Sequence, residues 1–265
     1  MRSRQTCASA GTGPKMFDLH ERTALVTGAS TGLGQSIAVT LTKAGARVVI
    51  TGRRRATLDE TAALCTAVGA EPVALAMDVR DVSHIQGAVA SAQHALGRID
   101  ILVNNAGVNR PQPGLEVDVE TWDDLFNINV RGGFFCAQAV APGMIERGFG
   151  RVIFISSQSG LIGIPGQPVY CASKGAIVNL VRTLGVEWAK HGITVNSVAP
   201  TFVETNLTRA RLNQPEYRAF VLGKIPRGEL ATPEDVACAV VYLASEEAGM
   251  VNCATLPVDG GWTAW

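Results

Sequence analysis

Tyr170 and Lys174 stand four residues apart in a stretch whose apolar spacing predicts a helix from Val169 onward. Residues at this spacing lie on the same face of a helix, one turn apart. An ammonium group this close lowers the pKa of a phenol from its ordinary ~10, so that the phenol can act as acid or base nearer neutral pH. Helices also carry this spacing by chance, and the pair alone therefore does not define a reaction.

A second stretch, T-A-L-V-T-G-A-S-T-G-L-G from Thr23 to Gly34, predicts a buried strand, a tight turn and a helix. Gly28, Gly32 and Gly34 allow a sharp turn and the close approach of a ligand. The free N–H groups and the dipole of a helix start favour an anion such as a pyrophosphate. The alternative is a turn that only joins strand to helix, and the spacing G-x-x-x-G-x-G is not the usual G-x-G-x-x-G. The flanking strand and helix favour phosphate binding.

The second predicted strand, 47–51, is followed by Gly52 and three arginines, Arg53 to Arg55. Dinucleotide folds that bind NAD place an acidic residue here for the ribose 2′-hydroxyl, whereas arginine suits a 2′-phosphate. Glycine replaces the acid in this chain, so the sequence favours NADP(H), with NAD(H) as the alternative. We expect Arg53 to contact the phosphate and Arg54 to support it. A solvated run of charge at a helix start is the competing interpretation.

Polar residues follow the third and fourth predicted strands. Asp78 can accept a hydrogen bond from an adenine amino group, or it can cap the helix that follows. Asn104 and Asn105 stand where open α/β sheets bind ligands, although Asn104 can equally brace neighbouring strands. Asn129 falls within a long helical pattern, where a buried amide is costly without a hydrogen bond, so we expect it to have a specific partner.

Short apolar strands alternate with amphipathic helices along the chain. This order predicts one α/β domain over residues 16–265, with a parallel sheet and helices on both of its faces. The predicted strands are 24–26, 47–51, 72–77, 101–103, 152–155, 193–198 and 256–258. The predicted helices are 36–43, 58–68, 82–96, 119–147 and 170–190, and Pro233 suits the first turn of another.

The composition excludes several classes of protein. The chain has 23 Lys and Arg against 23 Asp and Glu, so no net field attracts nucleic acid or acidic lipid, and no apolar run is long enough to span a membrane. The six cysteines are scattered without C-x-x-C pairs, which argues against a zinc site or a disulfide framework and favours the reducing cytoplasm. We expect no metal. Residues 1–15 lack a signal-peptide core and read as a disordered extension, with a transit peptide as the alternative.

Together these pieces resemble the short-chain dehydrogenase/reductase family. The matching motifs are Thr27-Gly28-x-x-x-Gly32-x-Gly34, Asn104-Asn105-Ala106-Gly107, Asn129, Ser157 and Tyr170-x-x-x-Lys174. They occur in the family's order and spacing, and the likeness extends over residues 19–265. The resemblance implies a Rossmann-like doubly wound sheet of seven parallel strands. It also implies an enzyme that transfers a hydride between a nicotinamide cofactor and an alcohol or carbonyl.

The resemblance further assigns roles to individual residues. Tyr170 would be the general acid or base, Ser157 would polarise the substrate oxygen, and Lys174 would lower the pKa of the phenol and hold the nicotinamide ribose. Asn129 would fix a water that links the lysine to solvent. The residues expected to bind the cofactor are Gly28, Ser30, Thr31, Gly32, Leu33, Gly34, Arg53, Arg54, Asp78, Val79, Asn105, Ala106, Gly107, Tyr170, Lys174, Pro200, Val203 and Thr205.

The chain departs from the family at Thr201, where a glycine is usual, which puts the local backbone angle in question. The segment 202–230 resembles the family's substrate lid. Local likenesses at Arg110 and at the C-terminus are similar to gluconate 5-dehydrogenases and related sugar or sugar-acid dehydrogenases of this family. Arg110 would pair with a substrate carboxylate or remain a solvated loop arginine, and Gln158 and Gln167 would bind substrate hydroxyls.

Three other functions remain open at this stage: a general ketone reductase, a 3-oxoacyl-thioester reductase, and a dinucleotide-sensing regulator without turnover. The family implies a homotetramer built through the long helices 119–147 and 170–190 and the aromatic C-terminus. In that assembly Trp262 and Trp265, which we expect to be exposed on the single chain, would be covered.

Overall fold

Seven parallel strands form the central sheet of the computed structural model, which describes residues 16–206 and 208–265. The strand order is β3-β2-β1-β4-β5-β6-β7, so the order reverses between β1 and β4. The strands are β1 (Thr23–Val26), β2 (Arg47–Gly52), β3 (Val73–Ala76), β4 (Ile101–Asn104), β5 (Gly150–Ile155), β6 (Ile193–Pro200) and β7 (Thr255–Val258). All seven predicted strands are confirmed, whereas the expected extension 1–15 lies outside the described residues.

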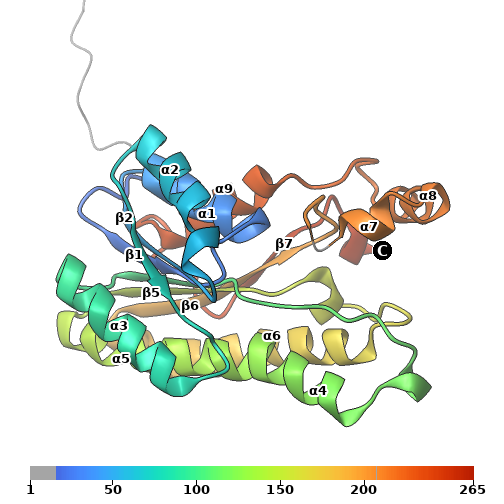
Figure 1. Ribbon diagram of the computed structural model, residues 1–265, viewed down its shortest axis with the longest axis horizontal. Coiled ribbons are helices and arrows are strands. Elements are labelled where there is room, and N and C mark those ends of the chain that lie inside the picture. Colours follow the sequence, from blue (N-terminus) through green and yellow to red (C-terminus); the bar gives the residue numbers. More distant parts are fainter. Residues whose placement is uncertain (1–15, 207) are drawn as a thin grey trace, which may run out of the picture.

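Helices cover both faces of the sheet, as predicted (Figure 1). They are α1 (Gly32–Lys43), α2 (Asp59–Val68), α3 (Val82–Leu96), α4 (Val119–Phe126), α5 (Gly133–Arg147), α6 (Pro168–Trp188), α7 (Arg209–Leu212), α8 (Pro215–Lys224) and α9 (Pro233–Ala244). One layer contains α1, α2 and α9, and the other contains α3, α5 and α6 (Figure 1). None of the helices in the described residues is long and apolar enough to cross a bilayer.

Neighbouring residues of β1 show how the sheet separates two cores. Val26 packs with residues of α1 and α9 in one buried cluster, whereas Leu25 packs with residues of α3, α5 and α6 in the other. Side chains alternate between the faces of a strand, so a strand that is apolar at every position serves both cores. The continuous apolar runs in the sequence therefore predict the layers correctly.

The predicted helix 119–147 is interrupted, which corrects that expectation. A π-helical turn, Asn127–Gly132, separates α4 from α5. Small residues at its end let the helix approach the sheet closely: a Cβ atom on Gly132 would lie 2.6 Å from the Val79 carbonyl oxygen, and one on Gly133 would lie 3.0 Å from the Phe154 ring. Such turns change the direction of side chains within a helix and are frequent at functional sites.

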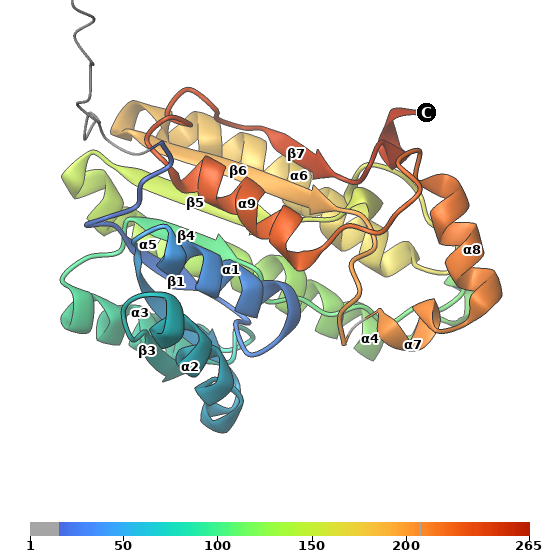
Figure 2. The same cartoon turned by 90° about the horizontal axis from the view of Figure 1, so that it is seen from above.

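The segment after β6, which contains α7 and α8, lies beyond the carboxyl ends of the strands (Figure 2). Leu212, Val221 and Ile225 from the α7–α8 region pack there against Trp262 from the C-terminal segment. Trp262 is only 8% exposed, so the expectation that it lies on the surface is wrong, whereas Trp265 is 80% exposed. Thr201 is buried without a left-handed backbone conformation, which explains why it can replace glycine.

Candidate active site

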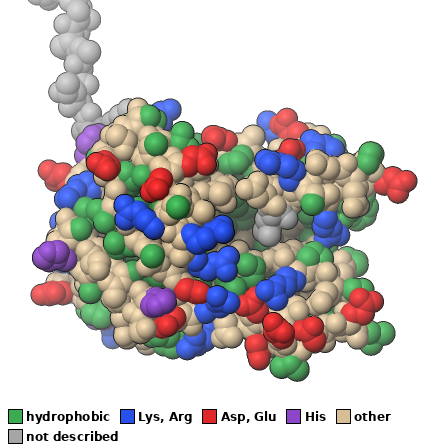
Figure 3. Space-filling model, in the orientation of Figure 1, with side chains coloured by type: hydrophobic (Ala, Val, Ile, Leu, Met, Phe, Trp, Pro, Cys, Tyr) green, Lys and Arg blue, Asp and Glu red, His purple; other side chains and the backbone are tan. Residues whose placement is uncertain are grey.

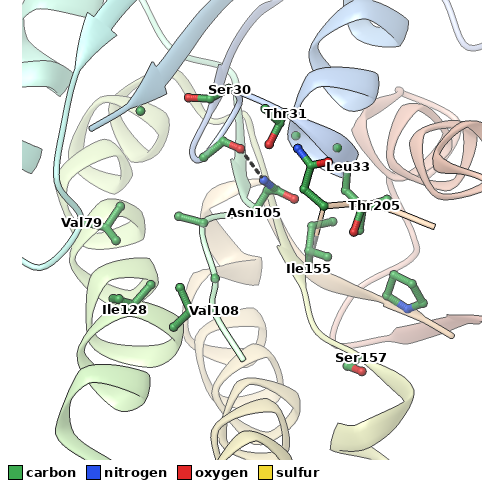
Figure 4. A pocket seen from close by; sticks show the side chains of 18 of the residues that line it. Ser30, Thr31, Leu33, Val79, Asn105, Val108, Ile128, Ile155, Ser157 and Thr205 are labelled. Carbon is green, nitrogen blue, oxygen red and sulfur yellow. Dashed lines mark hydrogen bonds between the residues drawn. The ribbon is translucent and has the colours of Figure 1, made fainter. Parts of the chain in front are cut away.

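A cavity of about 520 Å³ opens at the carboxyl ends of the strands, where the strand order reverses between β1 and β4. Open α/β sheets bind their ligands at this switch point. The cavity brings together most of the residues expected to bind a cofactor, together with Ser157 (Figure 4). They are Gly28, Ser30, Thr31, Gly32, Leu33, Gly34, Arg53, Asp78, Val79, Asn105, Ala106, Gly107, Tyr170, Lys174, Pro200, Val203 and Thr205.

The glycine turn is locked to the end of β4. The Asn105 side-chain amide donates to the carbonyl oxygens of Thr27 and Gly28, both at 3.0 Å. A Cβ atom on Gly34 would lie 2.2 Å from the Gly28 carbonyl oxygen, so this contact requires glycine. Thr31 precedes α1 without a side-chain cap, which leaves the first N–H groups of that helix for an anion in the cavity.

Tyr170, Lys174 and Ser157 meet at the other end of the cavity. Tyr170 and Lys174 come from the first turns of α6, and Ser157 is the second residue after the end of β5. Ser157 and Tyr170 are joined by a side-chain hydrogen bond. The Lys174 Nζ atom lies 5.7 Å from the centre of the Tyr170 ring and donates to the Ile155 carbonyl oxygen at 2.8 Å.

Asn129 lies in the π-helical turn, buried beside this group. Its Oδ1 atom accepts from the Val108 N–H at 2.8 Å, and its Nδ2 atom donates to the Val108 carbonyl oxygen at 3.0 Å and to the Ser173 hydroxyl at 3.1 Å. The prediction that Asn129 has a specific hydrogen-bond partner is confirmed. Asn129 does not line the cavity itself but fixes Val108, which does.

Known proteins are similar to this chain in sequence and in fold. Residues 28–263 match the family model described as enoyl-(acyl carrier protein) reductase. The chain is 39% identical over 249 residues to 2-dehydro-3-deoxy-D-gluconate 5-dehydrogenase from Dickeya dadantii, which covers 94% of this chain and 98% of that protein. The structure of a putative short-chain alcohol dehydrogenase from Sinorhizobium meliloti 1021 superposes with a TM-score of 0.92 at 40% identity, covering 94% and 99% of the two chains. The protein belongs to the short-chain dehydrogenase/reductase family.

Other similar proteins are named for different substrates or were solved with bound ligands. L-xylulose reductase from Mus musculus is 40% identical over 244 residues, covering 92% of this chain and 97% of that one. A gluconate 5-dehydrogenase from Burkholderia cenocepacia J2315, solved in complex with NADP and tartrate, superposes with a TM-score of 0.91 at 34% identity, covering 94% and 98%. As a member of this family, the protein is an oxidoreductase that acts on CH–OH groups with a nicotinamide dinucleotide.

The three arginines after β2 of this dehydrogenase/reductase have different surroundings. Arg53 lines the cavity, whereas Arg54 does not. Arg55 donates to the Ala74 carbonyl oxygen at 2.5 Å and pairs with Asp59 at 3.7 Å. A Cβ atom at Gly52 would lie 2.4 Å from the Ser30 hydroxyl oxygen, so the acidic residue typical of NAD-binding folds would require the Ser30 side chain to move. Figure 3 shows basic side chains gathered beside the hollow on this face of the molecule.

Asp78 lines the cavity but does not cap α3. Its carboxylate accepts from the Arg80 N–H at 3.0 Å and from the Arg80 guanidinium at 2.7 Å, and these contacts lower the pKa of the carboxyl group. Asp81 accepts from the Ser83 N–H at 2.8 Å and is the helix cap. The alternative that Asp78 caps the helix is therefore wrong.

Burial shifts the pKa values of both Tyr170 and Lys174, and the pKa of Tyr170 differs from the sequence-based expectation. Burial raises the pKa of Tyr170 to about 12, against a smaller lowering by the hydrogen bond with Ser157. Burial also lowers the pKa of Lys174 to about 8. The expected lowering of the phenol's pKa is wrong for the protein alone, because desolvation outweighs the hydrogen bond with Ser157. The Lys174 amine donates to Ile155 instead. Tyr170 is therefore a protonated phenol at neutral pH, which is the form that a general acid needs.

The residues expected to contact substrate have three different environments. The Arg110 guanidinium pairs with Asp124 at 2.5 Å, and its side chain is 49% exposed and does not line the cavity. The alternative of a solvated loop arginine therefore describes it, rather than a carboxylate ligand in the cavity. Gln167 accepts from the Asn109 amide at 2.6 Å. Gln158 is 1% exposed, and within the described chain both of its amide atoms lack a hydrogen-bond partner. The Asn104 amide likewise has no such partner, so the expected bracing of neighbouring strands is absent.

The cavity also contains residues that sequence reasoning missed. They are Gly52, Met77, Val108, Ile128, Ile155, Ser156, Thr201, Asn206 and Thr208. Most of these residues lie next to the carboxyl ends of strands, so the ends of the predicted strands could have indicated them. Ile128 carries no such signal, because it reaches the cavity only through the π-helical turn.

Proposed function

We propose that the protein transfers a hydride between NADPH and the carbonyl or alcohol carbon of a small sugar, polyol or sugar acid. The observation that carries this proposal is a single cavity that joins the glycine turn and Arg53 at one end to Ser157 and Tyr170 at the other. Relatives named for sugar-acid and polyol substrates support the substrate class, including D-threitol dehydrogenase from Mycolicibacterium smegmatis, which is 38% identical over 251 residues. Relatives solved with bound NADP support the cofactor.

The cofactor would lie along the floor of the cavity. Gly28, Ser30, Thr31, Gly32, Leu33 and Gly34 would hold the pyrophosphate against the start of α1. Arg53 would contact the 2′-phosphate, and Asp78 and Val79 would flank the adenine. Asn105, Ala106, Gly107 and Lys174 would hold the nicotinamide ribose, and Pro200, Val203 and Thr205 the carboxamide. When bound, the nicotinamide ring supplies or accepts the hydride, and the protein has to place the substrate carbon beside it.

The proton transfer belongs to Tyr170. In reduction its phenol donates a proton to the substrate oxygen while the Ser157 hydroxyl donates a hydrogen bond to the same oxygen. In oxidation Tyr170 accepts the proton, and the ammonium of Lys174 stabilises the tyrosinate. Asn129 would fix a water that links Lys174 to solvent, since a Cβ atom at Gly107 would lie 3.3 Å from the Asn129 oxygen and 3.5 Å from the Lys174 amine.

The proposal also covers the substrate lid, the oligomeric assembly and the cellular location of the protein. Residues 202–230 would close over the substrate, since this segment packs in its own cluster beyond the sheet. A homotetramer would cover the groove between α5 and α6, lined by Phe134, Phe135 and Leu180. A cytoplasmic location is supported by the described cysteines, which are all free thiols.

Absorbance of NADPH tests the proposal. We expect oxidation of NADPH with members of a panel of keto sugars, keto sugar acids and ketones, or reduction of NADP+ with the corresponding polyols and sugar acids. Tyr170→Phe should lower the rate about 1,000-fold while the cofactor still binds. Strong turnover of 3-oxoacyl thioesters instead, as the 38% identical reductase from Vibrio harveyi would suggest, would reject the substrate class. Binding of NADPH without turnover of any carbonyl would favour the regulator.

A further inference from the structure

The Asp78 carboxylate lines the cavity but is held by a cation outside it. The Arg80 guanidinium donates to both carboxylate oxygens, from Nη2 to Oδ2 at 2.7 Å and from Nε to Oδ1 at 3.1 Å. The backbone N–H of Arg80 also donates to Oδ1, at 3.0 Å. Arg80 itself does not line the cavity, and its side chain is 44% exposed. The charge at this point of the cavity wall is therefore set by a residue behind the wall.

Arg80 is fixed by neighbouring elements on its other side. Its Nη1 atom lies 3.4 Å from the carboxylate of Asp124 in α4, which also pairs with Arg110. Its carbonyl oxygen accepts from the guanidinium of Arg131, in the π-helical turn, at 2.8 Å. A guanidinium fork fixes the orientation of a carboxylate as well as neutralising its charge. Contacts to α4 and to the π-helical turn therefore help to hold Arg80 against Asp78.

Arg53 is the second cation near the Asp78 carboxylate, and it lines the same cavity. The hydrogen bond with Arg80 lowers the pKa of the Asp78 carboxyl group most, and the charge of Arg53 lowers it least. Arg53 is thus close enough to act on Asp78, whereas the ion pair of Asp78 among the described residues is with Arg80. A guanidinium without a carboxylate partner can pair with a phosphate in the cavity.

We propose that Arg80 is a specificity-determining residue for NADPH: it neutralises the Asp78 carboxylate, so that Arg53 pairs with the 2′-phosphate of the cofactor. This inference rests on the proposed function, which places the 2′-phosphate at Arg53, and adds a residue outside the cavity. A phosphate monoester carries a charge of about −1.5 to −2 at neutral pH. A carboxylate without Arg80 would repel that charge and compete for Arg53. NADH has a hydroxyl group at this position, so its binding depends less on the carboxylate charge.

Fluorescence titrations with NADPH and with NADH, in the absence of substrate, test the proposal because they measure binding independently of turnover. Arg80→Gln should weaken NADPH binding about 5- to 10-fold and NADH binding less than about 2-fold. Arg80→Lys keeps the charge without the fork and should weaken NADPH binding less than about 3-fold. Arg47→Gln is the matched control, because it removes the same charge at the exposed amino end of β2. It should change neither affinity more than about 2-fold.

Removing the carboxylate charge separates neutralisation from a direct contact between Arg80 and the cofactor. Asp78→Asn keeps an oxygen that accepts hydrogen bonds and should leave NADPH affinity within about 3-fold of wild type. In that background Arg80→Gln should lower NADPH affinity less than about 2-fold, because no carboxylate charge is left to neutralise. The backbone groups of residue 80 that bond Asp78 and Arg131 are present in each variant, so the loop is expected to keep its position.

An undiminished effect of Arg80→Gln in the Asp78→Asn background would overturn the inference, since Arg80 would then act on the cofactor without Asp78. An equal loss of NADPH and NADH binding in Arg80→Gln would overturn it as well. If wild type binds NADPH no more tightly than NADH, the cofactor of the proposed function fails together with this inference. If the affinities change as expected while no carbonyl is reduced, hydride transfer fails and this inference stands.

Discussion

The two ends of the cavity are built in different ways. At the cofactor end, backbone contacts fix the geometry: Asn105 ties β4 to the glycine turn, and the space beside Gly34 admits no side chain. At the substrate end, Ser157 and Val108 line the cavity, and the amides that follow them in the chain, Gln158 and Asn109, lie outside the lining with polar atoms that have no partner in the described chain. The α7–α8 region there packs in a small cluster of its own with Trp262.

This difference indicates which end is complete without ligand. A dinucleotide requires a fixed backbone cradle, because its phosphates bind to N–H groups that cannot adjust. Substrate recognition instead uses side chains whose hydrogen bonds form only when the substrate enters. Changes at the cofactor end should therefore affect every substrate equally, and changes at the substrate end should depend on which substrate is present.

The largest effect should come from adding one methyl group at the cofactor end. Gly34→Ala places a Cβ atom 2.2 Å from the Gly28 carbonyl oxygen, so the turn must move. We expect NADPH affinity, measured by fluorescence titration, to fall about 100-fold or more. Gly163→Ala on the substrate side is the matched control, since its Cβ atom would meet nothing within 4 Å, and it should change affinity less than about 2-fold. Equal effects of the two substitutions would contradict the comparison.

The next effect concerns Lys174, which is buried between the two ends. Lys174→Met should lower kcat about 100-fold, because the tyrosinate loses its neighbouring cation. The pKa of this lysine is lowered from 10.5 to about 8 in the folded protein. Burial of its charge therefore destabilises the native state below pH 8, and this cost disappears as the pH rises from about 8 to 10.5.

The variant should consequently be more stable than wild type at pH 7, by up to about 3 kcal/mol. The difference should shrink towards pH 10.5, the ordinary pKa of lysine. Urea unfolding across this pH range measures it, with the exposed Lys190→Met as control. A variant less stable than wild type at pH 7 would show that the amine's hydrogen bond to Ile155 outweighs the burial of its charge.

A smaller and cofactor-specific effect is expected at Arg53. Removing this cation with Arg53→Ala should weaken NADPH binding about 10- to 100-fold and leave NADH nearly unchanged. Arg54→Ala provides the control, because Arg54 does not line the cavity. Comparable losses for both cofactors, or a larger loss with the Arg54 variant, would reject the assignment of the 2′-phosphate to Arg53.

The smallest effect should follow from removing Arg110. Its guanidinium is occupied by Asp124, so Arg110→Ala should change kcat/KM for a sugar acid less than about 3-fold. Steady-state kinetics with the acid and with a ketose provide the measurement. A loss of 10-fold or more that is confined to the acid would show that Arg110 binds the substrate carboxylate.

The sequence predicts the cofactor end well because its features are local. The strand before Gly28, the helix after Gly34 and the apolar runs of the other strands follow from neighbouring residues alone. The helix from Val169 likewise predicts that Tyr170 and Lys174 share a face, and the structure places both in the cavity. The family resemblance supplies the roles, which no local pattern contains.

The substrate end depends on residues distant in the chain, so the sequence predicts less of it. The burial of Trp262 needs Leu212, Val221 and Ile225 from the α7–α8 region, and the pairing of Arg110 needs Asp124 from α4. The pKa of Tyr170 is decided by the surroundings that desolvate it rather than by its spacing from Lys174. The burial of Trp262 and the pKa of Tyr170 differ from the sequence-based expectations because tertiary packing outweighed a local pattern, and the ion pair of Arg110 has no local pattern that could predict it.

The most direct test of the account follows the hydride itself. NADPH carrying deuterium at C4 of the nicotinamide, on the face that is transferred, is incubated with enzyme and a polyhydroxy ketone, and the product is analysed by mass spectrometry and NMR. We expect one deuterium on the former carbonyl carbon of the alcohol, and about 1,000-fold slower formation with Tyr170→Phe. Oxidation of NADPH without deuterium in the alcohol, or an undiminished rate in the variant, would contradict proton transfer by Tyr170 coupled to hydride transfer in this cavity.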